Sequence, residues 1–360
     1  MLDEKYLKSE ERIIFALRSL YSKYGYLPYK MSKFEEYDLY AKNKEFLVSD
    51  GVITFTDTNG KLLALKPDVT LSIIKNATEA KGVKQKVYYS ENVYRVSGST
   101  RQYKEIMQTG LECIGDIDLY DVCEVVSLSA KSLEAISKDY VIEISHMGIL
   151  SAVLEKIGGS EGFFAEIAEC IRKKSQHEII ECCEKYGVDK NGANLLCEFV
   201  TVYGAPSVVF EKLSALGLED SLPAIKELKS LCALLDGKAQ ISLDFSIVND
   251  MNYYNGIVFN GFIKGVCECV LFGGRYDKLL TKMGKSGGGV GFAIYTDLIA
   301  GINKESKGYD VDVLLIYKDE TPYKKVEDAV EWLVSQGKSV SAQKSIPEKL
   351  RYKELKEMED

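Results

Sequence analysis

Histidine is scarce in this 360-residue sequence, which contains only His146 and His177. Neither has a partner at the spacing of a metal-ligand pair, which argues against a zinc site and against a Ser-His-Asp triad. The nine cysteines include no C-x-x-C pair. We interpret them as reduced thiols that fill apolar space, with Cys267 and Cys269 alternating along a strand. No metal and no cofactor is therefore expected.

Long apolar runs and an excess of positive charge are also missing. No run is long enough to span a bilayer, and the N-terminal MLDEKYLKSEE is charged from its third residue, unlike a signal peptide. We therefore expect a soluble, cytoplasmic protein without a membrane partner. The formal net charge of −8 disfavours a broad nucleic-acid surface and leaves room for an acidic face toward a protein partner.

Strand patterns flank a block of short helical patterns. The block runs from about residue 148 to 237 and is broken at several glycines. A helix is predicted over 119–138, and Asn59-Gly60 is a strong hairpin signal. Strands are predicted at 87–96, 104–115, 140–145, 241–248, 254–263 and 265–274. Strands, then helices, then more strands predict an α+β fold with an antiparallel sheet core and a helical insert.

The end of the chain predicts a separate small unit. A strand over 309–317, a helix near 322–336 and the run KSVSAQ form a β-α-β pattern too short for a full doubly wound domain. We therefore divide the chain into a core, residues 1–305 including the insert, and a short α/β segment, residues 306–360.

A glycine-rich stretch, GGGVGFAIYTDLI at residues 287–299, suggests close approach of the backbone to something flat or charged. The pattern predicts a short strand followed by a helix-like run from Ala293. No Lys or Arg accompanies the glycines, and a Gly-Lys-Ser/Thr ending is missing, so the stretch is no phosphate-binding loop.

Two short segments offer side chains that could hold a small ligand. In LKPDVT (65–70), Asp68 and Thr70 can hold an ammonium group, or Asp68 can cap the helix that follows. In NYYNG (252–256), Tyr253 and Tyr254 combine apolar rings with hydroxyls, although both also suit a core. Neither segment decides between binding and structure by itself.

A predicted strand pair adds three polar groups. Arg95 ends one strand, and Gln108 and Glu112 lie four residues apart on the next, which places both on one face. That face is either a binding pocket or a solvated surface with ordinary cross-strand pairs. In FGGRYDKLL (272–280), Arg275 and Asp277 are interpreted as structural, because an arginine beside a glycine turn commonly ties loops together.

The order and spacing of these segments resemble the histidyl-tRNA synthetase family of class II synthetase folds, over roughly residues 1–305. The resemblance rests on LKPDVT, VYRVSGSTRQYKEIMQTGLECIG, IVNDMNYYNGIVF, GGRYD and GVGFAIYTDLI. It implies a class II synthetase-like core. It also implies the following histidine-binding set: Asp68, Thr70, Arg95, Gln108, Glu112, Tyr253 and Tyr254.

The same resemblance implies that the ATP side of the cleft has degenerated. Leu298 and Asn249 stand where the family carries arginines, Ser97 replaces a glutamate and Ser32 a proline. Adenylate formation develops charge on phosphate, and one fixed cation aimed at such charge contributes roughly 3 kcal/mol. A leucine and an amide cannot replace two guanidinium groups.

Such a core, followed by a shortened anticodon-binding-like segment, resembles the regulatory subunits of ATP phosphoribosyltransferase. That resemblance implies a non-catalytic partner of the short catalytic subunit in the first step of histidine biosynthesis. It further implies a homodimer within a hetero-octamer and L-histidine as the feedback effector, bound in the inherited pocket or between subunits. It makes tRNA binding unexpected. A stand-alone histidine sensor and an active histidyl-tRNA synthetase remain as alternatives.

Overall fold

The computed structural model describes residues 7–47, 51–78, 82–97, 100–218, 222–248, 253–299 and 308–358. The chain forms two compact units, residues 1–302 and 303–360. Within the described ranges, no helix is both long and apolar enough to cross a membrane.

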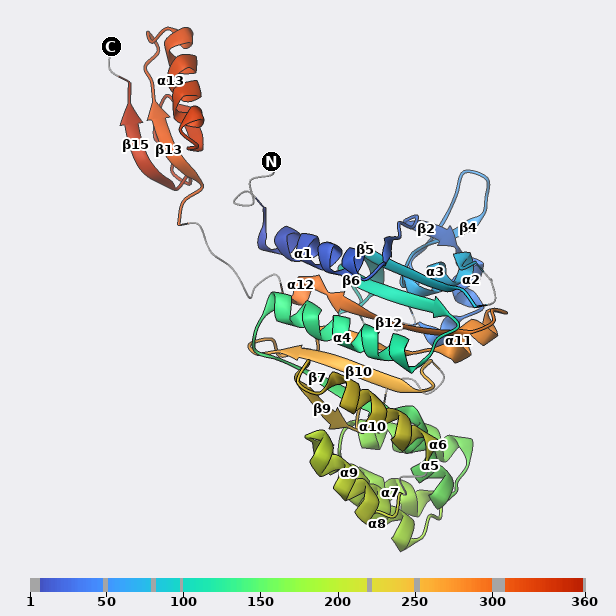
Figure 1. Ribbon diagram of the computed structural model, residues 1–360. Coiled ribbons are helices and arrows are strands. Elements are labelled where there is room, and N and C mark those ends of the chain that lie inside the picture. The colour runs from blue at the N-terminus through green and yellow to red at the C-terminus, as the bar shows by residue number, and fades with distance from the viewer. Residues whose placement is uncertain are drawn as a thin grey trace. The chain divides into compact units, whose positions relative to one another are not determined.

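A nine-stranded sheet forms the centre of the first unit, in the order β1-β5-β6-β12-β11-β10-β7-β9-β8 (Figure 1). The predicted α+β class is confirmed, but the sheet is mixed: β1 runs parallel to β5, and β7 runs parallel to β9. The second pair is parallel because the helical insert forms the crossover between its strands. The strands are β1 (Leu27–Pro28), β5 (Lys84–Val96), β6 (Tyr103–Gly115), β7 (Tyr140–His146), β8 (Tyr203–Gly204), β9 (Ile241–Asp244), β10 (Ile257–Ile263), β11 (Leu271–Arg275) and β12 (Gly288–Tyr295).

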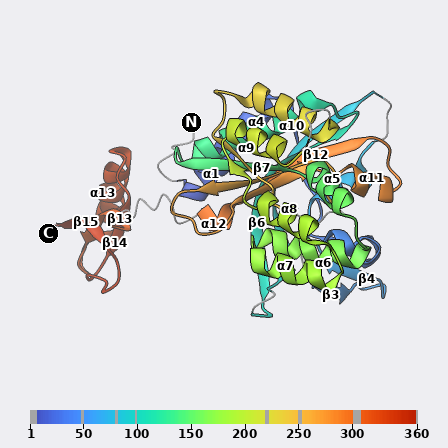
Figure 2. The same ribbon diagram turned by 90° about the horizontal axis from the view of Figure 1, so that it is seen from below.

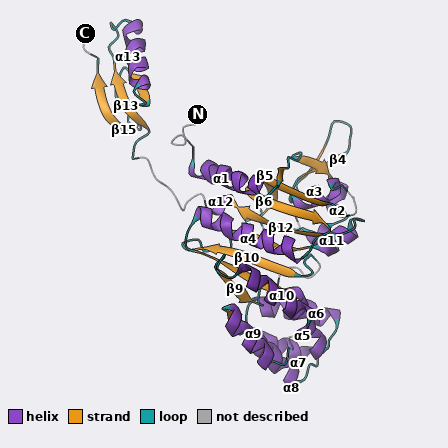
Figure 3. Ribbon diagram, in the orientation of Figure 1, coloured by secondary structure: helices purple, strands orange, loops and turns teal. Residues whose placement is uncertain are grey.

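Two amphipathic helices lie along this sheet, α1 (Ser9–Lys23) and α4 (Leu119–Ile136) (Figure 3). In α1, Ile13, Leu17 and Tyr21 recur every four residues and are buried, as expected for a helix with one apolar stripe. The start of α4 is fixed by a reciprocal capping box, in which Asp118 and Asp121 each accept the other's backbone N–H.

A small three-stranded sheet packs with short helices beside the central sheet. It confirms the predicted hairpin, since β3 and β4 pair antiparallel around Gly60, whose φ of 82° suits glycine. Apolar side chains of α2, α3 and α11 join a second core with Val87 and Tyr89 of β5. The elements are β2 (Phe34–Glu36), α2 (Tyr37–Ala41), η2 (Lys44–Phe46), β3 (Thr54–Thr56), β4 (Leu62–Leu65), α3 (Thr70–Asn76) and α11 (Asp277–Lys282).

In the described part of the chain, the six helices α5 to α10 lie between β7 and β9 and form the insert. Helices α6, α7 and α8 gather side by side in both views (Figures 1 and 2). Helix α10 packs on α4 and α5, which joins the insert to the sheet core. The six are α5 (Met147–Ile157), α6 (Glu161–Arg172), α7 (Gln176–Lys185), α8 (Lys190–Phe199), α9 (Pro206–Ala215) and α10 (Pro223–Leu235).

Two sequence-based predictions near the end of the first unit are wrong. The helix-like run does not begin at Ala293: β12 continues to Tyr295, because its last residues pair with β6, and α12 (Thr296–Ile299) follows. The strand expected over 265–274 begins only at Leu271. Cys267 and Cys269 therefore lie before the strand, and Cys267 is exposed rather than filling apolar space.

The second unit contains β13 (Val311–Ile316), α13 (Tyr323–Ser335) and β14 (Val340–Gln343) in the predicted β-α-β order. It also has a strand that sequence patterns missed, β15 (Tyr352–Glu357), which pairs parallel with β13. Its sequence YKELKE is rich in Lys and Glu, residues that are depleted in strands, so no local signal predicts it.

Candidate functional site

A cavity of about 440 Å³ opens on one face of the central sheet. Its position follows from strand register, because Gln108 and Glu112 on β6 face the same side and lie opposite Tyr295 and Gly291 of β12. All seven predicted ligand-binding residues line it: Asp68, Thr70, Arg95, Gln108, Glu112, Tyr253 and Tyr254. Sequence reasoning missed further wall residues: Phe46, Leu47, Tyr89, Phe272, Tyr276, Gly291, Phe292, Ala293 and Tyr295.

Glu112 lies at the floor of the cavity. Both of its carboxyl oxygens accept hydrogen bonds, from Thr70 Oγ1 at 2.6 Å and from Tyr276 Oη at 2.5 Å. Burial raises the pKa of Glu112 from 4.5 to about 8; the bonds from Thr70 and Tyr276 oppose this shift, and nearby Asp68 adds to it. Glu112 can therefore gain or lose a proton near neutral pH as the charge of a ligand requires.

Asp68 caps the helix that follows it and also lines the cavity. Its Oδ1 accepts the backbone N–H of Leu71 at 2.8 Å, which fixes the first turn of α3, and the side chain also lines the cavity. Burial raises the pKa of Asp68, while the Leu71 bond and the charge of Arg95 lower it. The Leu71 N–H thus holds the Asp68 carboxyl group in place as a hydrogen-bond acceptor in the cavity wall.

Arg95 supplies positive charge to the cavity wall and is only 7% exposed. Its Nε donates to the carbonyl oxygen of Pro67 at 2.9 Å, and one terminal nitrogen donates to Tyr295 Oη at 2.9 Å. These bonds orient the guanidinium, so a ligand carboxylate would meet a cation already held in position.

Aromatic rings form another side of the cavity. The ring centroids of Tyr253 and Tyr254 are 4.5 Å apart, and Tyr253 lies 5.9 Å from Tyr276 and 6.0 Å from Phe46. Such a wall suits a flat ring, and the tyrosine hydroxyls can bond to its nitrogen atoms.

The glycines of β12 make room for side chains of this chain itself. A Cβ at Gly291 would lie 1.8 Å from Glu112 Oε2, and one at Gly289 would lie 2.3 Å from the Tyr276 ring. A Cβ at Gly288 would lie 2.5 Å from Asp277 Oδ1. The glycines of this stretch therefore leave space for Glu112, Tyr276 and Asp277 of the same chain. This explains why the stretch is rich in glycine although it has no cation to bind a phosphate.

Two of the three positions that we interpret as degenerate, Ser97 and Leu298, are described, and neither lines the cavity. Leu298 packs against the main apolar core from α12, and Ser97 follows β5 with its N–H bonded to the carbonyl of Gln102 at 2.8 Å. Asn249 lies outside the described residues. Among these three positions, the two that are described contribute no cation.

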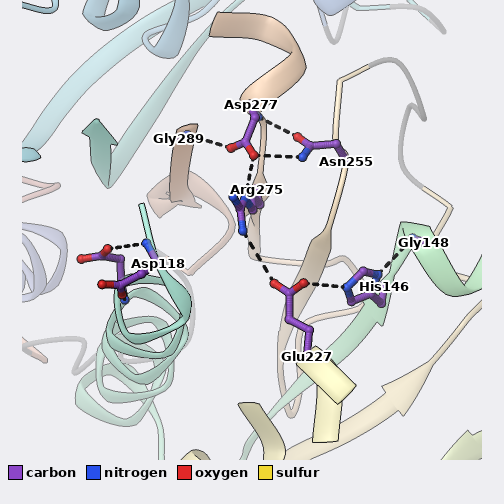
Figure 4. Close-up of polar contacts among 9 residues, drawn as sticks. Asp118, His146, Gly148, Glu227, Asn255, Arg275, Asp277 and Gly289 are labelled. Atoms are coloured by element: carbon purple, nitrogen blue, oxygen red, sulfur yellow. Dashed lines mark hydrogen bonds and ion pairs between the residues drawn. The ribbon is translucent and has the colours of Figure 1, made fainter. Parts of the chain in front are cut away.

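The predicted structural role of Arg275 and Asp277 is confirmed (Figure 4). Arg275 Nε donates to Asp277 Oδ2 at 2.8 Å, and Asp277 also accepts from the backbone of Gly289 and the amide of Asn255. Asn255 in turn accepts the Asp277 N–H at 2.7 Å. This cluster fixes the chain directly after Tyr254.

Comparisons with known proteins agree on one family. The histidyl-tRNA synthetase family profile matches residues 2–299. The chain is 30% identical, over 324 residues covering 87% of it and 84% of the relative, to the ATP phosphoribosyltransferase regulatory subunit of Caldanaerobacter subterraneus subsp. tengcongensis.

Solved structures share the fold. One from Bacillus halodurans C, described as an ATP phosphoribosyltransferase regulatory subunit/histidyl-tRNA synthetase, superposes with a TM-score of 0.81 at 22% identity, covering 99% of this chain and 95% of that one. A chain of the ATP phosphoribosyl transferase (HisG:HisZ) complex from Thermotoga maritima gives 0.63 at 21% identity, covering 82% and 97%. The chain therefore belongs to the histidyl-tRNA synthetase-like family, in its group of ATP phosphoribosyltransferase regulatory subunits.

Proposed function

We propose that this regulatory subunit binds L-histidine in the cavity on the central sheet and reports its presence to the short catalytic subunit of ATP phosphoribosyltransferase. The subunit would not itself catalyse the reaction. The observation that carries the proposal is the buried Glu112, held by Thr70 and Tyr276 at the floor of a cavity with an aromatic wall. Its setting in the cell would be the cytoplasm.

The lining of the cavity matches the chemical groups of histidine. Asp68 and Thr70 can accept hydrogen bonds from an ammonium group, and the oriented Arg95 attracts a carboxylate. Glu112 and the tyrosine hydroxyls can bond to the two ring nitrogens of an imidazole, and Gln108 can donate or accept. An amino acid with an imidazole side chain uses all of these groups at once.

Regulation follows if histidine binds one arrangement of the assembled complex more tightly than another. The difference in affinity then shifts the catalytic subunit toward its inactive state. The coupling is reciprocal. If histidine changes the affinity between the two subunits by some factor, the catalytic subunit changes the histidine affinity of this chain by the same factor. We propose a homodimer of this chain inside a hetero-octamer as the assembly in which this coupling operates.

The first test mixes the purified chain with the short catalytic subunit and measures phosphoribosyl-ATP formation. Activity is expected to rise on mixing and to fall when histidine is added. Failure of the two chains to co-purify, with no activation, would favour a stand-alone sensor.

The second test is a calorimetric titration of this chain alone, which is expected to give heat with histidine. No heat, combined with inhibition of the complex by histidine, would favour a histidine site between subunits.

Amino-acid activation is expected to be at background level. Exchange of labelled pyrophosphate into ATP requires cations at the phosphates, and Leu298 packs against the apolar core instead of offering one. The assay compares this chain with a working histidyl-tRNA synthetase under the same conditions. Histidine-dependent exchange at the rate of the working enzyme would instead support the synthetase alternative.

A further inference from the structure

A chain of polar side chains runs from Glu227 of the helical insert to Asn255, which directly follows Tyr254 of the cavity wall (Figure 4). We call Glu227, Arg275, Asp277 and Asn255 the relay. Glu227 comes from α10 of the insert, whereas Arg275 ends β11 and Asp277 begins α11. The relay therefore links residues of three elements and ends beside the tyrosines of the cavity wall.

The insert end of the relay is charged and fixed. The Gly148 N–H donates to His146 Nδ1 at 3.0 Å, so this nitrogen is unprotonated and Nε2–H faces Glu227 Oε2 at 3.3 Å. The hydrogen bond from His146 lowers the pKa of Glu227, opposed by burial and helped by Arg275. Glu227 is therefore a carboxylate tied to the first turn of α5 as well as to α10.

The cavity end of the relay is tightly bonded. Asp277 and Asn255 exchange two hydrogen bonds, at 2.7 and 3.1 Å, and the Asn255 N–H donates to the carbonyl of Arg275 at 3.1 Å. Tyr254 directly precedes Asn255 and packs so closely on β11 that a Cβ at Gly274 would lie 2.6 Å from its ring. A shift of Arg275 is therefore transmitted to the aromatic wall.

The two ends of the relay meet between Glu227 and Arg275, and we call this contact the joint. It is open in the sense that the two side chains are too far apart for a hydrogen bond. Glu227 Oε1 is buried and has no hydrogen-bond partner among the described residues, and it lies 3.8 Å from Arg275 Nη1. A hydrogen bond needs about 2.7–3.2 Å between such atoms, and a buried acceptor without a donor is unfavourable. A movement of α10 toward β11 by roughly 1 Å would close this joint and satisfy Oε1.

We propose that the relay couples the position of the helical insert to the histidine cavity, with Arg275 as the positioning residue. When histidine binds, Tyr254 and the adjacent Asn255 shift toward it. Asn255 moves Asp277 and Arg275 with it through their hydrogen bonds, and Arg275 then comes within hydrogen-bond distance of Glu227. The insert then moves with the occupancy of the cavity and carries the signal outward. This inference rests on the proposed function, in which histidine is the occupant.

The test compares the full-length chain with E227Q by calorimetry and by hydrogen exchange. In the unchanged chain, histidine is expected to slow amide exchange in α5 and α10. In E227Q that slowing is lost and the dissociation constant for histidine rises about three- to tenfold, the size typical of residues that couple sites without touching ligand. The control E178Q removes an insert ion pair to Lys173, outside the relay, and should behave like the unchanged chain.

Equal slowing of the insert amides by histidine in both chains, or equal dissociation constants, would overturn the relay while leaving histidine binding intact. A ligand-free comparison separates the relay from the proposed function. At 3.8 Å the charges of Glu227 and Arg275 already attract each other without histidine, so the Asn255 amide of the ligand-free chain is expected to exchange faster in E227Q than in the unchanged chain. If the unchanged chain binds no histidine, the proposed function fails; unchanged exchange at Asn255 then overturns the relay as well.

Discussion

Replacing Gly291 with alanine is expected to abolish histidine binding and to lower the free energy of unfolding by about 3 kcal/mol or more. The new Cβ would lie 1.8 Å from Glu112 Oε2 and 2.5 Å from the carbonyl oxygen of Leu111. Glu112 cannot move aside without losing Thr70 and Tyr276, and the Leu111 carbonyl belongs to the central sheet. Denaturant unfolding and calorimetric titration measure the two effects.

Gly162 provides the matched control for this substitution. It lies in α6, and a Cβ there would have its nearest neighbour at 3.5 Å, an ordinary contact. Gly162→Ala should therefore leave histidine binding unchanged and stabilise the helix by up to about 1 kcal/mol. A G291A variant with the stability and histidine affinity of the unchanged chain would show that the cavity floor is not packed as described.

Replacing Glu112 with glutamine is expected to remove much of the pH dependence of stability. Burial raises the pKa of Glu112 from 4.5 to about 8 in the folded state, so folding favours its protonated form. The resulting stabilisation is complete below about pH 4.5 and is lost as pH rises through about 8, a change of a few kcal/mol. The glutamine variant does not titrate and should lose less stability over this range.

Urea unfolding at a series of pH values measures this difference, and histidine titration of the same samples measures binding. E112Q should bind histidine about ten- to a hundredfold more weakly, because an amide cannot accept the hydrogen bonds of Thr70 and Tyr276 on both of its terminal atoms as the carboxyl group does. Parallel pH profiles for the two chains would show that Glu112 does not titrate between pH 4.5 and 8. Unchanged affinity would remove Glu112 from the histidine site.

Local sequence patterns predicted which elements carry several of the cavity residues and which way those residues face. The two-residue alternation of β6 placed Gln108 and Glu112 on one face, and the LKPDVT segment placed Asp68 at the start of α3. Their convergence in one cavity required more than periodicity, because Asp68 and the tyrosines come from distant parts of the chain. The family resemblance supplied that step.

Local sequence patterns could not predict the contacts that depend on strand register. Tyr276 is 164 residues from Glu112 in the sequence, and only the order β6-β12-β11 brings its hydroxyl to the carboxyl group. The same holds for Gly291, whose need to be glycine appears only when Glu112 lies opposite. The open joint between Glu227 and Arg275 likewise depends on how α10 packs, which no short motif specifies.

The place of Leu298 has a consequence for how this chain could change in evolution. Its side chain is partly buried and packs against the main apolar core, on a helix of four residues. An arginine at this one position would lay its aliphatic stem against the same apolar neighbours and keep its charged end in solvent. We therefore expect that a single substitution at position 298 would not create amino-acid activation, and that a change from regulator to synthetase would need further substitutions.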